Sequence, residues 1–138
     1  MANAEAENRT HKRYSIMGCT IRYKPDTFFS RFSKVSHKYM VLDISQSGMQ
    51  FITKEKFNKQ TPLLLDITAP TLNREIIHIK GRVVWIKASP ALHIYGVGVE
   101  FINMKEADRL RLQLLLDNAA ASKSKISDNV HLDKADKR

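Results

Sequence analysis

The sequence has few features that could cross-link or anchor the chain. It contains one cysteine, Cys19, which excludes an internal disulfide and is expected to be a core residue of a strand. No apolar run approaches the roughly 20 residues of a membrane-spanning helix. The polar N-terminal stretch MANAEAENRTHKR predicts no secretory signal peptide. These absences predict a chain that works in the cytoplasm without membrane insertion.

The sequence also lacks the short motifs of enzymes and metal sites. It has no Gly-x-Ser-x-Gly nucleophile elbow, no GxxxxGK phosphate loop and no CxxC pair. The histidines do not follow zinc-ligand spacing; they are His11, His37, His78, His93 and His131. We therefore expect no catalytic residue, no metal and no cofactor, and a protein that is not an enzyme.

The charge of the chain is strongly unbalanced. The formal net charge is +9 at pH 7 and the pI is about 9.8. Such a balance favours an anionic partner, which can be a nucleic acid, a nucleotide or a membrane surface. The basic excess is greatest in the N-terminal third of the chain.

The pattern of apolar residues predicts strands followed by one helix. Stretches rich in β-formers alternate with turn residues, and they cover residues 14–23, 38–44, 48–53, 62–70, 75–88 and 94–102. Residues 75–88 fit either one long strand or a strand bent at Gly81, and Trp85 is expected in the core. Residues 24–37 fit either a short helix or a loop folded on its phenylalanines. From Asn103 the period changes to that of an amphipathic helix ending near residue 120.

These elements divide the chain into three parts. Residues 1–13 form a flexible N-terminal arm, residues 14–120 form the domain, and residues 121–138 form a disordered polar tail. Asn103 is expected to cap the helix, with Glu106 in capping-box register. Short antiparallel strands followed by one helix favour a small β-barrel that the helix plugs or flanks.

Two short motifs stand out from this background. The first is Arg-x-x-x-Arg at Arg9 and Arg13, which chance alone produces often in so basic a chain. The second is Asp-x-Ser-x-x-Gly at Asp43, Ser45 and Gly48, which is much rarer by chance. Since Asp, Ser and Gly are also common turn residues, an ordinary turn is the alternative interpretation of the second motif.

Together the two motifs resemble those of the PilZ domain, the bacterial receptor module for cyclic di-GMP. The family pattern places RxxxR just before the first barrel strand and [DN]xSxxG at a turn between two later strands. The resemblance covers about residues 8–118, including "GRVVWIK" and "YGVGVEFINMKEADRLRLQLL". It implies an all-β fold with one closing helix, namely a small antiparallel barrel of six or seven strands plus a C-terminal helix.

The resemblance also implies the ligand and the residues that bind it. Cyclic di-GMP offers guanine edges, planar faces and two phosphates, all of which suit the planar fork of arginine. A carboxylate can accept hydrogen bonds from guanine N1–H and N2–H₂. The expected ligand-binding residues are Arg9, Arg13, Asp43, Ser45 and Gly48, with Lys12, Ser47 and Gly98 as secondary contacts.

The output is expected to run through a partner protein, once the ligand has ordered the N-terminal arm. No DNA or RNA partner is expected. Two alternatives stay open: a small basic barrel that binds single-stranded nucleic acid, and a PilZ-fold adaptor that binds no nucleotide. Phe28, Phe29 and Phe32 fit either a cover of the core or a docking patch, and Gly96 and Gly98 fit bulge or close-packing positions.

Overall fold

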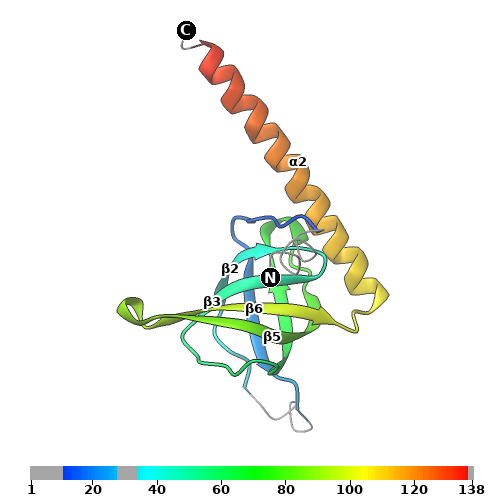
Figure 1. Ribbon diagram of the computed structural model, residues 1–138. Helices are drawn as coiled ribbons and strands as arrows, with labels where there is room; N and C mark the ends of the chain where they lie inside the picture. Colours follow the sequence, from blue (N-terminus) through cyan, green and yellow to red (C-terminus); the bar gives the residue numbers. More distant parts are fainter. Residues whose placement is uncertain (1–10, 28–33, 137–138) are drawn as a thin grey trace.

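A computed structural model describes the backbone of residues 11–27 and 34–136, and the side chains of these ranges as far as residue 122. Its centre is a closed barrel of six antiparallel strands, in the order β1-β2-β3-β6-β5-β4. Figure 1 shows the barrel with one long helix leaving it. The strands are β1 Thr20–Pro25, β2 Tyr39–Ile44, β3 Gly48–Thr53, β4 Pro62–Thr68, β5 Ile77–Ser89 and β6 Ile94–Ile102. The all-β barrel expected from the sequence is confirmed, with six strands.

Alternation of side chains along the strands builds the core. Period-2 patterns bury one face of β1, β4 and the first half of β5 and leave the other face half-exposed or exposed. The largest buried side chains are Phe51, Ile21, Ile44, Met49, Leu63, Leu65, Ile67 and Ile77. Cys19, 2% exposed, also lies in this core, although it precedes the first strand. The expected strand over residues 14–23 begins only at Thr20, because Gly18 turns the chain with a φ of +78°.

The first strand, β1, pairs unequally with its two neighbours in the barrel. β1 pairs with β4 over six residue pairs but with β2 over only two, Thr20 with Met40 and Ile21 with Tyr39. Beyond this short seam, Ser36 takes over the role of a strand partner. Its backbone N–H donates to the Tyr23 carbonyl, 2.8 Å away, and its hydroxyl accepts from the Tyr23 N–H at 2.9 Å. The phenylalanines at positions 28, 29 and 32 lie outside the described residues.

Two register shifts interrupt the ladders. One lies between Val41 and Asp43 in β2, and the other lies between Val83 and Trp85 in β5. Of the two alternatives for residues 75–88, the single long strand is confirmed, because Gly81 pairs with Phe101 in continuous register. The prediction that Trp85 is a core residue is wrong: past the second shift it is only half-buried. A bulge inserts an extra residue and so changes which side chains face inward.

The helix α2 runs from Glu106 to Asp136 and differs from the expected one at both ends. Its first hydrogen bond joins the Arg109 N–H to the Lys105 carbonyl, so Asn103 is not the cap; it adopts a φ of +48° in the link from β6. The helix continues where a disordered tail was expected from residue 121. No glycine or proline lies between residues 106 and 136, so the sequence offers no stop signal there. In the described ranges, no helix has the length and apolarity needed to cross a membrane.

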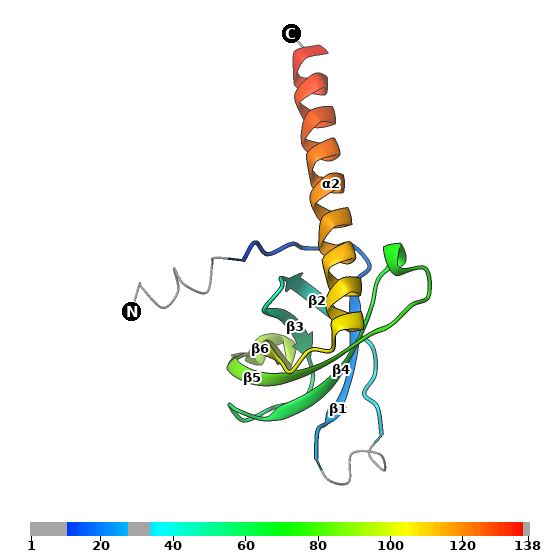
Figure 2. The ribbon, with the colours of Figure 1, turned by 90° about the vertical axis from the view of Figure 1, so that its right-hand side faces the viewer.

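The first turns of α2 are fixed to one end of the barrel, while the rest projects away from it (Figure 2). Leu112, Leu115 and Leu116 are buried against the core. Asp108, 6% exposed, accepts from the backbone N–H of His78 at 3.2 Å and from Arg111 at 3.4 Å.

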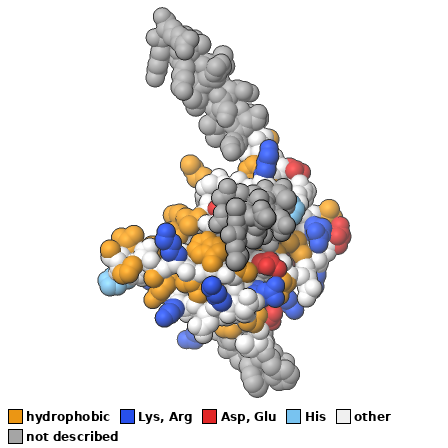
Figure 3. Space-filling view, in the orientation of Figure 1, with side chains coloured by type: hydrophobic (Ala, Val, Ile, Leu, Met, Phe, Trp, Pro, Cys, Tyr) orange, Lys and Arg blue, Asp and Glu red, His pale blue; other side chains and the backbone are white. Residues whose placement is uncertain are grey.

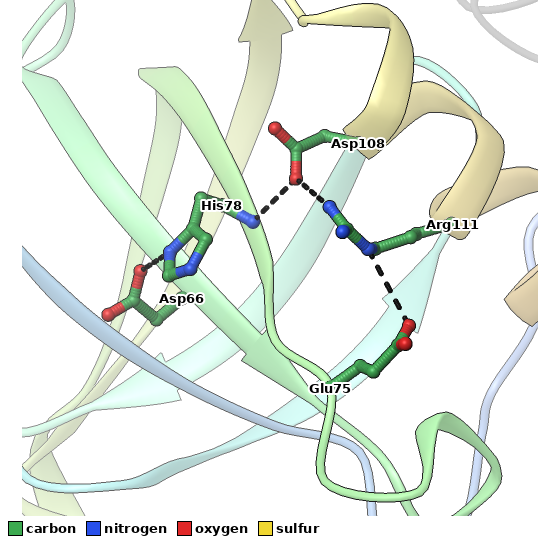
Figure 4. A network of polar contacts seen from close by, with 5 residues as sticks. All are labelled: Asp66, Glu75, His78, Asp108 and Arg111. Carbon is green, nitrogen blue, oxygen red and sulfur yellow. Dashed lines mark hydrogen bonds and ion pairs between the residues drawn. The ribbon is translucent and has the colours of Figure 1, made fainter.

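A polar network continues from this anchor across the strands (Figure 4). Arg111 lies 3.5 Å from Glu75, and His78 Nδ1 lies 2.7 Å from Asp66 Oδ1. Because Asp66 belongs to β4 and His78 to β5, the network ties the helix to two neighbouring strands.

Candidate functional site

The turn between β2 and β3 carries the Asp-x-Ser-x-x-Gly motif and is closed by its own hydrogen bonds. The Ser45 N–H donates to the Gly48 carbonyl at 2.9 Å, and the Ser45 hydroxyl accepts from the Ser47 N–H at 3.2 Å. Ser45 is only 1% exposed. Its hydroxyl therefore shapes the turn from within, whereas Ser47 is half-buried at the surface.

Gly48 is required by the close approach of the neighbouring strand. A Cβ atom built on Gly48 would lie 2.3 Å from the Val99 carbonyl oxygen. Among the described glycines, only Gly18 has a positive φ, so backbone conformation is not the reason for a glycine at this position. The glycine lets β3 and β6 stay in contact at the turn, where Gly48 pairs with Glu100.

The register shift in β2 explains why Asp43 faces outward. Val41 and Ile44 are buried, whereas Leu42 and Asp43, two consecutive residues between them, are both accessible. The Asp43 side chain therefore points to the outer surface near the end of β2, close to the turn. This position makes its carboxylate available to a ligand or to another side chain.

The end of the N-terminal arm lies beside this carboxylate. Tyr14 and Ile44 form an isolated antiparallel bridge with two N–H to carbonyl bonds of 2.9 Å. Next to the bridge, Arg13 Nη1 donates to Asp43 Oδ1 at 3.0 Å, and the two side chains are 35% and 25% exposed. The structure thus brings one residue of each motif together, thirty positions apart in the sequence.

The other expected site residues have different surroundings. Arg9 lies outside the described residues. Lys12 is exposed on the arm. Gly98 is buried on β6 opposite Gln50, and a Cβ atom there would lie 2.1 Å from the Trp85 indole nitrogen. Gly98 therefore serves close packing, with the Trp85 indole covering it. Figure 3 shows apolar side chains gathered on the face of the barrel that it draws.

The sequence interpretation missed the connection between the turn and the helix. Gln46, at a variable position of the motif, donates from Nε2 to Gln113 Oε1 at 2.7 Å, and Gln113 in turn donates to Asp117 at 2.9 Å. A cavity of about 480 Å³ separates the arm from α2, with Tyr14, Ile16 and Leu115 among its lining residues. No sequence signal marks Gln46, because its partner depends on where the helix docks.

Sequence comparison decides the family of this fold. The model of the PilZ domain matches residues 7–118. The chain belongs to the PilZ domain family. PilZ domains are ligand-binding receptor modules rather than enzymes. A comparison with curated proteins finds no match.

Solved structures of PilZ proteins share the fold of this PilZ domain at low sequence identity. The MrkH–c-di-GMP complex of K. pneumonia matches with a TM-score of 0.65 and 17% identity over 85% of this chain and 55% of MrkH. YcgR of Escherichia coli in complex with c-di-GMP matches with a TM-score of 0.67 and 12% identity, over 88% of this chain and 50% of YcgR. The PilZ domain of YcgR from Escherichia coli with c-di-GMP matches with a TM-score of 0.62 and 11% identity, over 87% of this chain and 97% of that domain. This chain spans about half the length of the complete MrkH and YcgR chains.

Proposed function

We propose that this PilZ domain is a receptor for cyclic di-GMP in the bacterial cytoplasm, and that the ligand binds at the corner formed by Arg13, Asp43 and the turn of residues 45–48. The contact between Arg13 and Asp43 carries the proposal, because it joins the two motifs at one surface position. Family membership and the ligands named for the MrkH and YcgR structures support the choice of nucleotide.

The chemistry of the corner suits a guanine nucleotide. The Asp43 carboxylate can accept from guanine N1–H and N2–H₂, and the Arg13 guanidinium can bond guanine O6 and N7 or a phosphate, or stack on a base. Arg9 is proposed as the second arginine that binds the ligand. Ser45 and Gly48 act by shaping the turn, while Lys12 and Ser47 are proposed as secondary contacts. Because Gly98 is covered by Trp85, it contributes to the surface rather than through a direct contact.

Ligand binding changes the arm in this proposal. Because Arg13 bonds Asp43 in the structure, the ligand would insert between the two groups or exchange their bond for its own. Residues before His11 would then be ordered over the nucleotide, at a cost of roughly 1–2 kcal/mol of backbone entropy per residue that charge-assisted bonds offset. The newly covered surface is what a partner protein would recognise.

Calorimetric titration with cyclic di-GMP tests this site and gives its stoichiometry. Arg9→Ala, Arg13→Ala and Asp43→Ala should each weaken binding by about 1–3 kcal/mol, the value of a lost bidentate base contact. Arg13→Lys should also weaken it, because the charge is kept but the fork is lost. Arg22→Ala, an exposed arginine of β1, is the matched control. Equal affinities across the set would refute the site.

Selectivity separates nucleotide recognition from simple charge attraction. Cyclic di-AMP should bind far more weakly, because adenine N1 is an acceptor facing the Asp43 carboxylate. Hydrogen exchange at saturating cyclic di-GMP should slow the amides of residues 5–13. Similar binding of both dinucleotides, or of oligonucleotides, would instead favour a general binder of nucleic acid.

A further inference from the structure

A groove of about 370 Å³ is lined by residues of β1, β4 and β5 and of the start of α2. Figure 2 shows how these elements are arranged. Apolar side chains form part of its lining: Leu64 and Met104 are half-buried, and Val35 is 46% exposed. None of its lining residues belongs to the corner around Arg13 and Asp43. The groove is therefore a second surface feature of the domain.

Three lysines surround the apolar part of the groove. Lys24 of β1 and Lys80 of β5 are the direct neighbours of Leu64 across the sheet, so they flank it in one row. Lys105, just before α2, also lines the groove. Within the described ranges, none of the three lysines takes part in an ion pair. The groove thus presents an apolar centre with a positive rim.

The two carboxylates of the groove bond groups other than the three lysines. Asp66 faces His78 at 2.7 Å, and the buried Asp108 accepts from the His78 backbone and from Arg111 (Figure 4). Asp66 therefore helps to join two strands, and Asp108 joins the helix to β5. Among the described residues, neither carboxylate forms an ion pair with the three lysines.

We propose that this groove binds an acidic segment of a partner protein that carries leucine-like side chains between its carboxylates. The apolar side chains would seat on Leu64 and Met104, and the carboxylates would meet Lys24, Lys80 and Lys105. Among the described residues that line the groove, there is no Phe, Tyr or Trp on which a base could stack, whereas Leu64 and Met104 offer apolar contacts. These features favour an acidic polypeptide over nucleic acid. The inference does not depend on cyclic di-GMP binding.

Panning of a phage-displayed library of random peptides, each of about 12 residues, against the full chain tests the groove. The enriched peptides should combine Asp or Glu with Leu, Ile or Met. A synthetic peptide of the enriched sequence is then titrated by fluorescence polarisation. The triple variant Lys24→Glu, Lys80→Glu, Lys105→Glu should bind it about tenfold or more weakly, because like charges then face each other. Leu64→Gln should also weaken binding.

The matched control reverses three lysines elsewhere on the surface. Lys54, Lys56 and Lys59 are exposed in the link between β3 and β4, and their change to Glu gives the same net charge as the groove variant. This control should retain peptide binding, and all variants should keep the melting temperature of the wild type. Failure to enrich acidic peptides, or equal loss of binding in both charge reversals, would overturn the proposal. So would binding of a single-stranded oligothymidylate that only the groove variant loses.

Discussion

Arg13 and Asp43 hold each other at the outer surface of the barrel, with Arg13 Nη1 3.0 Å from Asp43 Oδ1. An ion pair with this degree of exposure contributes only about 0–1 kcal/mol to stability, because water screens the charges. A ligand that offers each group a better partner can therefore replace the pair at little cost. The pair places the arginine at the corner beside the turn of residues 45–48.

Removal of Arg13 should separate binding from stability. Arg13→Ala is expected to change the free energy of unfolding by about 1 kcal/mol or less, while it lowers the affinity for cyclic di-GMP. Urea unfolding followed by circular dichroism measures the first effect, and calorimetry measures the second. A large loss of stability would show that the arginine mainly holds the fold.

Gly48 should not tolerate even one added methyl group. Gly48→Ala places Cβ 2.3 Å from the Val99 carbonyl oxygen, and the backbone there cannot move without disturbing the pairing of β3 with β6. The expected loss is about 1–3 kcal/mol of unfolding free energy. Gly96→Ala is the matched control, because its nearest neighbour would be Trp85 Cζ3 at 3.6 Å, an ordinary contact. Equal losses for the two variants would contradict the argument.

The single tryptophan of the chain reports on the packing at Gly98. Gly98→Ala would put Cβ 2.1 Å from Trp85 Nε1, so the indole has to swing away from β6. We expect the emission of Trp85 to shift to longer wavelength, as its ring meets more water. In a double-mutant cycle, Trp85→Ala should reduce the stability cost of Gly98→Ala. An unchanged spectrum would mean that the indole does not cover Gly98.

Asp108 should matter more for stability than other acidic residues of the helix. Asp108→Ala leaves the part-buried His78 N–H without its acceptor and releases Arg111, and the unpaired donor should cost about 1 kcal/mol or more. Glu106→Ala, at an exposed position of the same turn, should cost much less. Chemical unfolding of both variants gives the comparison. Similar values would show that the helix is held by its leucines alone.

Stability should fall in alkaline solution through Cys19. Burial raises the pKa of the Cys19 thiol from 9.0 to about 12. Above about pH 9 the unfolded chain loses this proton while the folded chain keeps it, so the unfolded state is favoured increasingly up to about pH 12. Burial also raises the pKa of Tyr23, which acts in the same direction. Between pH 9 and pH 12, the free energy of unfolding of Cys19→Ala should therefore fall less than that of the wild type. Urea unfolding at several pH values measures both, and an equal fall would contradict the raised pKa of Cys19.

Local pattern predicted the strands well and the irregular positions poorly. β2, β3 and β6 lie where runs of β-formers between turn residues predicted them. The position of Trp85 on the outside follows from a register shift that alternation cannot reveal. Asn103 has the chemistry of a helix cap, but the link from β6 holds it at a positive φ.

The sequence names candidate residues for the site, but it does not predict which of them contact one another. Asp43 and Arg13 stand out in the sequence because two motifs of one family contain them. Their direct bond depends on the bridge between Tyr14 and Ile44 and on the bulge that turns Asp43 outward. The bond between Gln46 and Gln113 depends on the docking of α2. Such contacts join segments far apart in sequence, and no local pattern specifies them.

The closed order of the strands also limits how other chains can attach. An open sheet edge accepts strands from partners by β-augmentation and from copies by aggregation. Within the part of the chain that the structure describes, every strand has a neighbour on each side. The seam between β1 and β2, with two residue pairs, is where the ring would open most easily. While it stays closed, recognition has to work through side chains, and stacking into fibrils first requires the ring to break.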